Sequence, residues 1–158
     1  MFLIGQYDSP FVRRVAIALR LYRIAFEHRP WSTFGDADRI APYNPLRRVP
    51  TLVLEGGESL IESTAILDYL DETVGPDKAM LPAKGLERRK QLRICALATG
   101  LGDKAVSLVY ERVLRFTSEA HPALLASARY PALTAHAARC EALPPFQEIV
   151  QPLSPPKG

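Results

Sequence analysis

The fold is decided by the stretch NPLRRVPTLVLEGGESLIES, residues 44–63. Pro50 stands directly before the apolar run 51–54, a position that proline tolerates because it cannot donate to a ladder in mid-strand. Gly56 and Gly57 separate that run from a second one at 59–61, which is typical of a β-hairpin. A helical pattern begins at Glu62, so the stretch predicts a strand, a turn, a second strand and the start of a helix.

Two features of this stretch also predict a binding site. The Val49–Pro50 bond is a candidate for the cis form, which costs only about 0.5–1 kcal/mol for X–Pro. A cis bond would turn the amide and carbonyl of Val49 outward as an unpaired edge that can pair with a peptide-like ligand. Glu62 and Ser63 lie at a helix N-terminus, where free N–H groups and the macrodipole favour an anion. The same pattern also fits a plain hairpin that leads into an amphipathic helix.

The bulk properties are those of a soluble globular protein. The chain has 158 residues, enough for one domain or two small ones, with 47% hydrophobic and 23% charged residues. No apolar run approaches the ~18–20 residues that a membrane span needs. The apolar run at 2–4 is too short for a signal peptide and has no charged segment before it. We therefore expect a cytoplasmic protein with no membrane partner.

Charge and cysteine usage narrow the function classes. The net charge is +3, and the arginines of the first third are too dilute, and too poor in interleaved aromatics, to indicate a nucleic-acid partner. They could favour a small anionic ligand. Cys95 and Cys140 are far apart, without C-x-x-C or zinc spacing, so we expect no dithiol redox site and no metal. Both are expected to be buried, reduced thiols.

The first half of the chain has the element order β-α-β-α-β-β-α. A short apolar run at 2–4 predicts a strand, and Ser9 followed by Pro10 predicts a helix start. Apolar residues at helical spacing follow through residue 19, with arginines on the other side. A second strand within 24–31, a short helix within 36–43, the hairpin and a helix over 62–74 complete a small α/β domain with a mixed sheet.

The second half predicts helices only. Residues 86–115 contain no proline and predict one helix of about 45 Å, loosened at Gly100 and Gly102. Residues 131–142 predict another helix, which Pro144 and Pro145 stop, and 146–150 predict a last turn.

Several motifs, taken in order and spacing, resemble the glutathione S-transferase family. They are SPFVRRV at 9–15, NPL at 44–46, RVPTL at 48–52, ESTAILDYL at 62–70 and the segment from YPAL at 130–133 to Phe146. The chain resembles a cytosolic, bacterial-like member of the serine class. The resemblance implies a thioredoxin-like, glutathione-binding domain at 1–76, a linker at 77–85 and an all-α domain at 86–158.

The resemblance also implies roles for individual residues. Val49, before a cis Pro50, would pair through its backbone with the cysteinyl part of glutathione. Glu62 would hold the γ-glutamyl amine, and Ser63 the γ-glutamyl carboxylate. Arg48 stands where the family often has a basic residue near the glycyl end. Arg47 departs from the small residue, usually glycine, that commonly precedes that position.

Ser9 is the residue predicted to activate the glutathione thiol. A hydroxyl at the start of the first helix can donate a hydrogen bond to the sulfur, and thiolate is the nucleophilic form. One charge-assisted hydrogen bond of roughly 1.5–3 kcal/mol would lower the thiol pKa by one unit or more. Tyr7 is the alternative hydroxyl, because some classes use a tyrosine near the end of the first strand. No cysteine lies here, which argues against the thiol-transfer branches of the family.

The resemblance thus implies an enzyme that conjugates glutathione, as co-substrate and without a metal, to a small electrophile. A glutathione-dependent isomerase or dehalogenase is a variant of that hypothesis, and a homodimer is the implied assembly. The alternative is a non-catalytic protein of this fold that acts in protein–protein interaction.

The helical domain departs from the family pattern and looks incomplete. The family normally has a helix antiparallel to the long one, then a central helix that starts with a Ser/Thr-x-x-Asp capping motif. Neither is found between Arg115 and Phe116. Either the chain is naturally shortened there, or the printed sequence omits a segment. In a continuous chain the long helix would expose an apolar face, which a partner subunit would cover.

Overall fold

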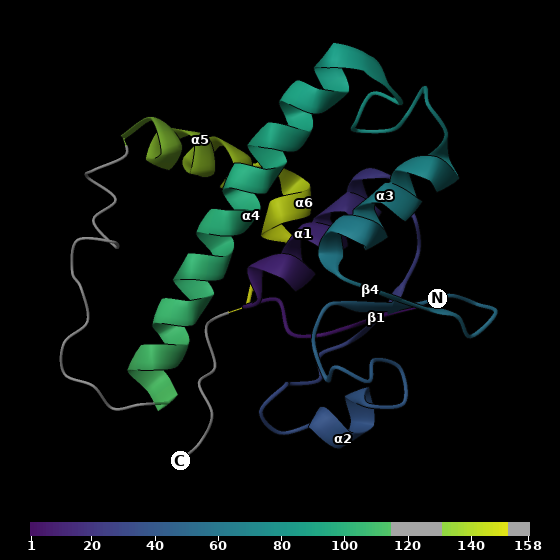
Figure 1. Ribbon diagram of the computed structural model, residues 1–158, viewed down its shortest axis with the longest axis vertical. Helices are drawn as coiled ribbons and strands as arrows, with labels where there is room; N and C mark the ends of the chain where they lie inside the picture. The colour runs from purple at the N-terminus through teal and green to yellow at the C-terminus, as the bar shows by residue number, and fades with distance from the viewer. Residues whose placement is uncertain (115–130, 152–158) are drawn as a thin grey trace.

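The structure is a computed structural model that describes residues 1–114 and 131–151. Figure 1 shows its elements, which in chain order are β1 (Phe2–Ile4), α1 (Pro10–Leu21), β2 (Glu27–Arg29), α2 (Ala37–Ile40), β3 (Thr51–Val53), β4 (Ser59–Ile61), α3 (Ser63–Val74), α4 (Gly85–Leu114), α5 (Pro131–Glu141) and α6 (Pro144–Gln147). The predicted order β-α-β-α-β-β-α followed by helices is confirmed, although β2 and α2 are shorter than the ranges in which they were predicted.

The four strands form one mixed sheet in the order β2-β1-β3-β4. β1 pairs parallel with β2, with Leu3 opposite His28, and antiparallel with β3, with Leu3 opposite Leu52. β3 and β4 are the predicted hairpin, in which Leu52 pairs with Leu60. The fold is therefore a thioredoxin-like domain followed by a helical region.

The two faces of the sheet bury different sets of residues, because neighbouring strand residues point to opposite sides. Leu3 and Leu52 join the larger core cluster with α1 and α3, whereas Ile4 and Val53 pack with Ile40 of α2. Figure 1 accordingly shows α1 and α3 on one side of the strands and α2 on the other. Since α1 contributes most of the larger cluster, its position relative to the sheet is closely constrained.

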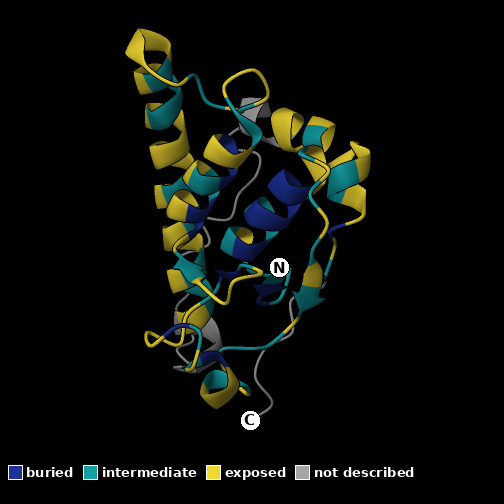
Figure 2. Ribbon diagram, turned by 90° about the vertical axis from the view of Figure 1, so that its right-hand side faces the viewer, coloured by how far each residue is buried: buried dark blue, intermediate teal, exposed yellow. Residues whose placement is uncertain are grey.

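α4 is one uninterrupted helix, so Gly100 and Gly102 do not loosen it. It contacts the first domain through polar pairs: Arg14 Nη1 donates to Thr99 Oγ1 at 2.8 Å, and Arg88 Nη2 donates to Asp68 at 3.0 Å. Most of its surface is exposed, in contrast to α1 (Figure 2). Cys95 lies on this exposed surface and Cys140 is half-buried. The expectation of buried cysteines is wrong, because a helix that packs along one narrow side leaves its other positions in solvent.

The C-terminal segment is anchored on α1. Ile149 is buried in the larger core cluster, and its carbonyl accepts from Arg13 Nε at 2.9 Å. The Arg13 guanidinium also makes a bidentate pair with Glu141, at 2.8 and 2.6 Å. Pro144 occupies the first turn of α6, so the two prolines begin a new short helix as well as ending α5.

Some predictions fall outside the described residues. The missing segment expected between Arg115 and Phe116 lies in the range 115–130, which the structure does not describe. Within residues 1–114 and 131–151, no helix has the length and apolarity to cross a membrane. The same residues include no group of three or more side chains that could hold a metal ion.

Candidate functional site

The loop before β3 is organised by a buried asparagine. Asn44 is 1% exposed, and its Nδ2 donates to the Arg48 carbonyl at 2.9 Å and to Thr51 Oγ1 at 3.1 Å. Its Oδ1 accepts from the Leu46 N–H at 3.0 Å. Buried polar groups need hydrogen-bond partners. The Asn44 side chain bonds to groups on both sides of the loop and so constrains its main chain. The sequence contains Asn44 in its decisive stretch, but its central position in this network was not predicted.

The Val49–Pro50 bond is cis, as the sequence suggested. Val49 is half-buried and Pro50 is buried at the start of β3. Among the described residues, the N–H and carbonyl of Val49 have no main-chain partner, whereas the neighbouring strand β3 is paired on both sides. An open donor and acceptor on one residue are what a peptide-like ligand needs for main-chain pairing.

Gly5 allows the chain after β1 to approach Val49. A Cβ at position 5 would lie 2.5 Å from Val12 Cγ2 and 2.8 Å from Val49 Cβ, and the backbone has φ 128. Both facts require glycine. His28 Nε2 lies 2.7 Å from the Gly5 carbonyl oxygen, so that nitrogen carries the hydrogen and donates. The loop that leads to Ser9 is therefore held against Val49.

Ser9 is the N-cap of α1. Its Oγ accepts from the Val12 N–H at 3.4 Å, and its carbonyl accepts from the Arg13 N–H at 2.9 Å. The cap uses a lone pair of the oxygen and leaves the hydroxyl hydrogen available. Capping the helix and donating to a thiolate therefore do not compete for the same part of the group.

Tyr7, the alternative hydroxyl, is held elsewhere. Its ring stacks on His28, with centroids 3.8 Å apart and an interplanar angle of 4°, and it packs against the core cluster. Burial raises the pKa of the Tyr7 hydroxyl, and the charge of Arg20 partly offsets that rise. Arg20 lies about three turns along α1 from Ser9. The Tyr7 hydroxyl thus interacts with the charge of Arg20 in the last turn of α1, whereas Ser9 caps the first turn.

Glu62 and Ser63 lie at the N-terminus of α3. Glu62 is the N-cap residue, with φ 68 and no side-chain capping bond, and its own side chain is exposed. Ser63 is 4% exposed and begins the helix. The first N–H groups of a helix lack intrahelical acceptors, and the macrodipole there is positive. This end of α3 can therefore receive a carboxylate.

Arg14 connects this helix end to α4. Its Nη2 donates to Thr64 Oγ1 at 2.8 Å, and its Nε is buried without a hydrogen-bond partner among the described residues. Burial lowers the pKa of Arg14, and the nearby acidic groups Cys95, Glu62 and Asp103 partly restore it. The sequence pattern placed arginines on the side of α1 opposite its apolar residues. At Arg14 this side is partly covered by α4, which only the tertiary packing could reveal.

The two arginines before Val49 have different roles. Arg47 has φ 53, the left-handed region that favours glycine, which explains why a small residue is usual at this position in the family pattern. It forms an exposed ion pair with Asp38 at 3.3 Å. Arg48 is exposed, and its carbonyl accepts from Asn44. The Arg48 side chain is therefore accessible to an anionic group.

A small cavity of about 110 Å³ lies between the start of α1 and the middle of α4. Its walls are formed by Pro10, Phe11, Arg14, Ala98, Thr99 and Gly102. A Cβ on Gly102 would lie 3.6 Å from the Phe11 ring, an ordinary contact distance, so this part of α4 lies close to the ring. Phe34 and Tyr110 also join the first domain to α4, with ring centroids 5.5 Å apart in an edge-to-face contact. The walls of the cavity are therefore mostly apolar, with Phe11 as the aromatic member and Arg14 and Thr99 as polar ones.

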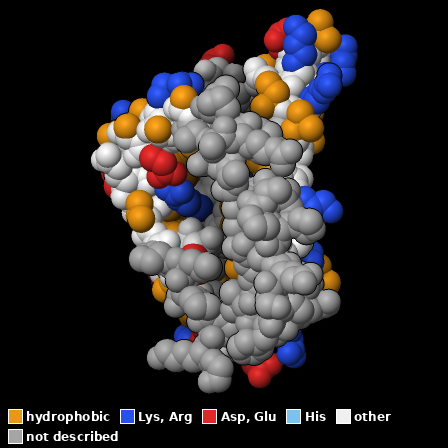
Figure 3. All heavy atoms as spheres, turned by 90° about the vertical axis from the view of Figure 1, so that its left-hand side faces the viewer, with side chains coloured by type: hydrophobic (Ala, Val, Ile, Leu, Met, Phe, Trp, Pro, Cys, Tyr) orange, Lys and Arg blue, Asp and Glu red, His pale blue; other side chains and the backbone are white. Residues whose placement is uncertain are grey.

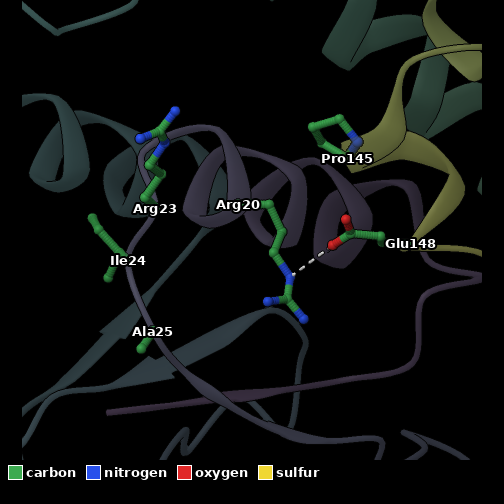
Figure 4. A pocket seen from close by; sticks show the side chains of 6 residues that line it. All are labelled: Arg20, Arg23, Ile24, Ala25, Pro145 and Glu148. Carbon is green, nitrogen blue, oxygen red and sulfur yellow. Dashed lines mark ion pairs between the residues drawn. The ribbon is translucent and has the colours of Figure 1, made fainter.

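A larger cavity of about 360 Å³ lies elsewhere, at the C-terminal end of α1. Figure 4 shows Arg20 directed toward Glu148, to which it is paired at 3.6 Å, while Arg23 points away from them. The charged groups do not converge on a common point, and the helix end here is the negative one. This cavity offers no arrangement for chemistry comparable to that around Ser9.

Comparison with known proteins identifies the class to which the fold and this site belong. Residues 3–78 match the family model of the glutathione S-transferase N-terminal domain. The chain belongs to the glutathione S-transferase family. An uncharacterized GST-like protein of Escherichia coli, YibF, is 36% identical over 125 residues, which cover 79% of this chain and 61% of the relative. The maleylacetoacetate isomerase of Pseudomonas aeruginosa is 36% identical over 102 residues, 61% of this chain and 48% of that protein.

The chain thus spans about three fifths or less of the length of these relatives. Among solved structures, a glutathione transferase family member from Pseudomonas fluorescens with bound glutathione superposes with a TM-score of 0.79 at 23% identity, covering 96% of this chain and 99% of that one. A glutathione S-transferase from Methylobacillus flagellatus, also with glutathione bound, is 28% identical with a TM-score of 0.65, covering 88% and 67% of the two chains.

Proposed function

We propose that this protein is a glutathione transferase of the serine class, in which Ser9 stabilises the thiolate of bound glutathione. The observation that supports the proposal is a set of three open groups in the first domain, on segments that other contacts join. These are the hydroxyl hydrogen of Ser9, the unpaired main chain of Val49 and the free N-terminus of α3 at Ser63. Gly5 brings the loop that leads to Ser9 against Val49, and Arg14 of α1 bonds to Thr64 in the first turn of α3.

In this proposal each part of glutathione has its own partner. The cysteinyl main chain pairs with Val49 before Pro50, and the γ-glutamyl carboxylate lies at the N–H groups that begin at Ser63. Glu62 holds the γ-glutamyl amine, and Arg48 lies near the glycyl carboxylate. The positive charge of Arg14 beside Glu62 supports binding of an anionic group at this end of α3. Glutathione acts as co-substrate, and the reaction needs no metal.

The electrophile is proposed to enter the space between Phe11 and α4. The mostly apolar lining of that cavity, with the Phe11 ring in its wall, supports a small, hydrophobic electrophile. The thiolate sulfur attacks the electrophilic carbon and the leaving group departs with its electron pair, or, in the isomerase variant, glutathione adds and is later released. The similarity to a maleylacetoacetate isomerase makes that variant worth including in every assay panel.

A homodimer is part of the same proposal. Ile94, Leu97 and Leu101 are 66%, 67% and 52% exposed on α4, at the i, i+3, i+7 spacing of one helix face. Hydrophobic side chains are visible among basic ones at the end of the molecule where α4 begins (Figure 3). An exposed apolar face of this kind favours coverage by a second subunit. The boundaries 1–76, 77–85 and 86–158 and a cytoplasmic location also stay predictions.

The test is glutathione binding followed by turnover. Isothermal titration should detect binding to the purified chain, and an activated aryl halide should then be conjugated at a rate that depends on both substrates. Absence of glutathione binding would refute the proposal. Binding without turnover, across aryl halides, alkyl halides and an isomerisable maleyl substrate, would support the alternative of a non-catalytic interaction protein.

A further inference from the structure

The C-terminal segment returns to the loop that carries Ser9. The N–H of Tyr7 donates to the side-chain Oε1 of Gln151 at 2.9 Å, a bond between residues 144 positions apart in the sequence. Tyr7 and Ser9 belong to the same turn between β1 and α1, which the Ser9 N–H closes on the Gln6 carbonyl at 3.2 Å. A side chain beyond α6 therefore holds the middle of the turn that places Ser9.

The Tyr7 N–H depends on this bond. It has no main-chain acceptor among residues 1–114 and 131–151, and the contact is partly buried. Buried N–H groups are nearly always paired, since an unpaired one loses its hydrogen bonds to water. Without Gln151, the peptide group before Tyr7 would have to rotate so that its N–H faces solvent. Because Ser9 follows only two residues later, this rotation would also change the orientation of Ser9.

Gln151 is itself fixed relative to α1. Two residues earlier, Ile149 is buried, and Arg13 binds its carbonyl. Arg13 lies one turn after Ser9 on α1, and its N–H donates to the Ser9 carbonyl at 2.9 Å. The second attachment of Arg13, to Glu141, adds α5 to the same assembly. The helix that Ser9 caps and the segment that carries Gln151 thus form one connected unit.

We propose that Gln151 is a positioning residue for the thiol site. By accepting from the Tyr7 N–H, its Oε1 sets the direction in which Ser9 presents its hydroxyl to the glutathione sulfur. This inference rests on the proposed function of Ser9. In this proposal Gln151 is not a contact of glutathione or the electrophile and acts through the main chain of Tyr7 alone. The C-terminal end of the helical region consequently tunes thiolate formation in the first domain.

The variant Gln151→Leu removes the acceptor at similar volume, and Gln151→Glu keeps oxygen acceptors at the same length. Gln147→Leu is a matched control, because Gln147 is an exposed glutamine on neighbouring α6. The pH profile of kcat/KM should give Gln151→Leu a thiol pKa higher by about half a unit to one unit. Its kcat should fall by about 3- to 10-fold, as expected for one hydrogen bond, with KM for glutathione nearly unchanged. Gln151→Glu keeps the acceptor for the Tyr7 N–H and should retain the wild-type conformation of the turn, although its added charge disfavours a nearby thiolate.

A purely structural role would lower stability without moving the thiol pKa. An unchanged pH profile in Gln151→Leu, or an equal shift in Gln147→Leu, would therefore overturn the proposal. Hydrogen–deuterium exchange over residues 5–9 provides a readout that does not need activity. Faster exchange there in Gln151→Leu, but not in Gln151→Glu, supports the contact even if the wild type proves unable to bind glutathione. Equal exchange in all variants overturns it, and failure of the proposed function is seen separately in the binding titration.

Discussion

Gly5 and Val49 approach so closely that a Cβ at position 5 would lie 2.8 Å from the Cβ of Val49. The contact joins the loop after β1 to the residue before the cis proline, which are far apart in the sequence. It brings the turn that carries Ser9 against the open main chain of Val49, and the geometry of the candidate site depends on it.

Replacing Gly5 by alanine should therefore damage both stability and binding. The added methyl group overpacks against Val12 and Val49, and the backbone with φ 128 is strained for any other residue. We expect a loss of about 2–4 kcal/mol in the free energy of unfolding, measured by urea denaturation, and a higher KM for glutathione. Gly35→Ala is the control, since a Cβ there would meet nothing within 4 Å. Equal stability of the two variants would contradict the close-approach argument.

Ser9→Ala should remove thiol activation while the fold persists. The lost hydrogen bond to the thiolate predicts a fall of about 10- to 100-fold in kcat/KM and a rise of one unit or more in the thiol pKa. Tyr7→Phe keeps the ring that stacks on His28 and should change the rate by less than about threefold. Steady-state kinetics over a pH series separates the two. A large loss in Tyr7→Phe with none in Ser9→Ala would reverse the assignment.

Asn44→Leu should destabilise the first domain by about 2–3 kcal/mol, because the Leu46 N–H loses its partner and the Arg48 carbonyl and Thr51 Oγ1 each lose one hydrogen bond. Thermal and urea unfolding measure this. Thr73→Val is a suitable control, since that hydroxyl bonds only within an exposed turn of α3, and it should cost less than about 0.5 kcal/mol. A comparable loss of unfolding free energy in both variants would mean that the hydrogen bonds of Asn44 stabilise the domain no more than an exposed hydroxyl does.

Leu97→Glu should convert the proposed dimer into a monomer. A charge placed in the middle of the exposed apolar face of α4 would have to be buried without a partner. Light scattering coupled to gel filtration reports the mass directly. Ala96→Glu adds the same charge about 100° around the helix and should leave the assembly unchanged. A wild-type chain that is monomeric at high micromolar concentration would remove the basis of this prediction.

The attachment of α5 to α1 should weaken in acid. Hydrogen bonding from Arg13 holds the pKa of Glu141 below its usual 4.5, while burial acts in the opposite direction. A carboxyl whose folded pKa is depressed stabilises the protein above its unfolded pKa and loses that contribution as the pH falls through the folded pKa. Glu141 is 48% exposed, so solvent screening limits the effect to about 0.3–1 kcal/mol. The stability difference between wild type and Glu141→Gln should be present at pH 6.5 and decrease as the pH falls below 4.5 and through the lowered folded pKa. A stability difference that persists in acid would show that it arises from packing and not from the ionised Glu141–Arg13 pair.

The local sequence was sufficient for elements whose signals are short-range. Ser9–Pro10 marked the start of α1, the two glycines marked the hairpin, and the proline-free run marked α4, because capping, turn geometry and helical propensity act within a few residues. The order and spacing of the motifs were also sufficient to identify the family. The candidate residues Ser9, Val49 and Ser63 could be named for the same reason, although their roles remain to be tested.

Other features depend on contacts between distant segments, which a single sequence does not display. The buried Nε of Arg14, the exposure of Cys95 and the bond between Tyr7 and Gln151 each follow from where α4 and the C-terminal segment pack. Local patterns specify which residues can form a helix or a turn. The tertiary structure decides which side of each helix is covered and which backbone groups are left open, because burial is a property of the assembled chain.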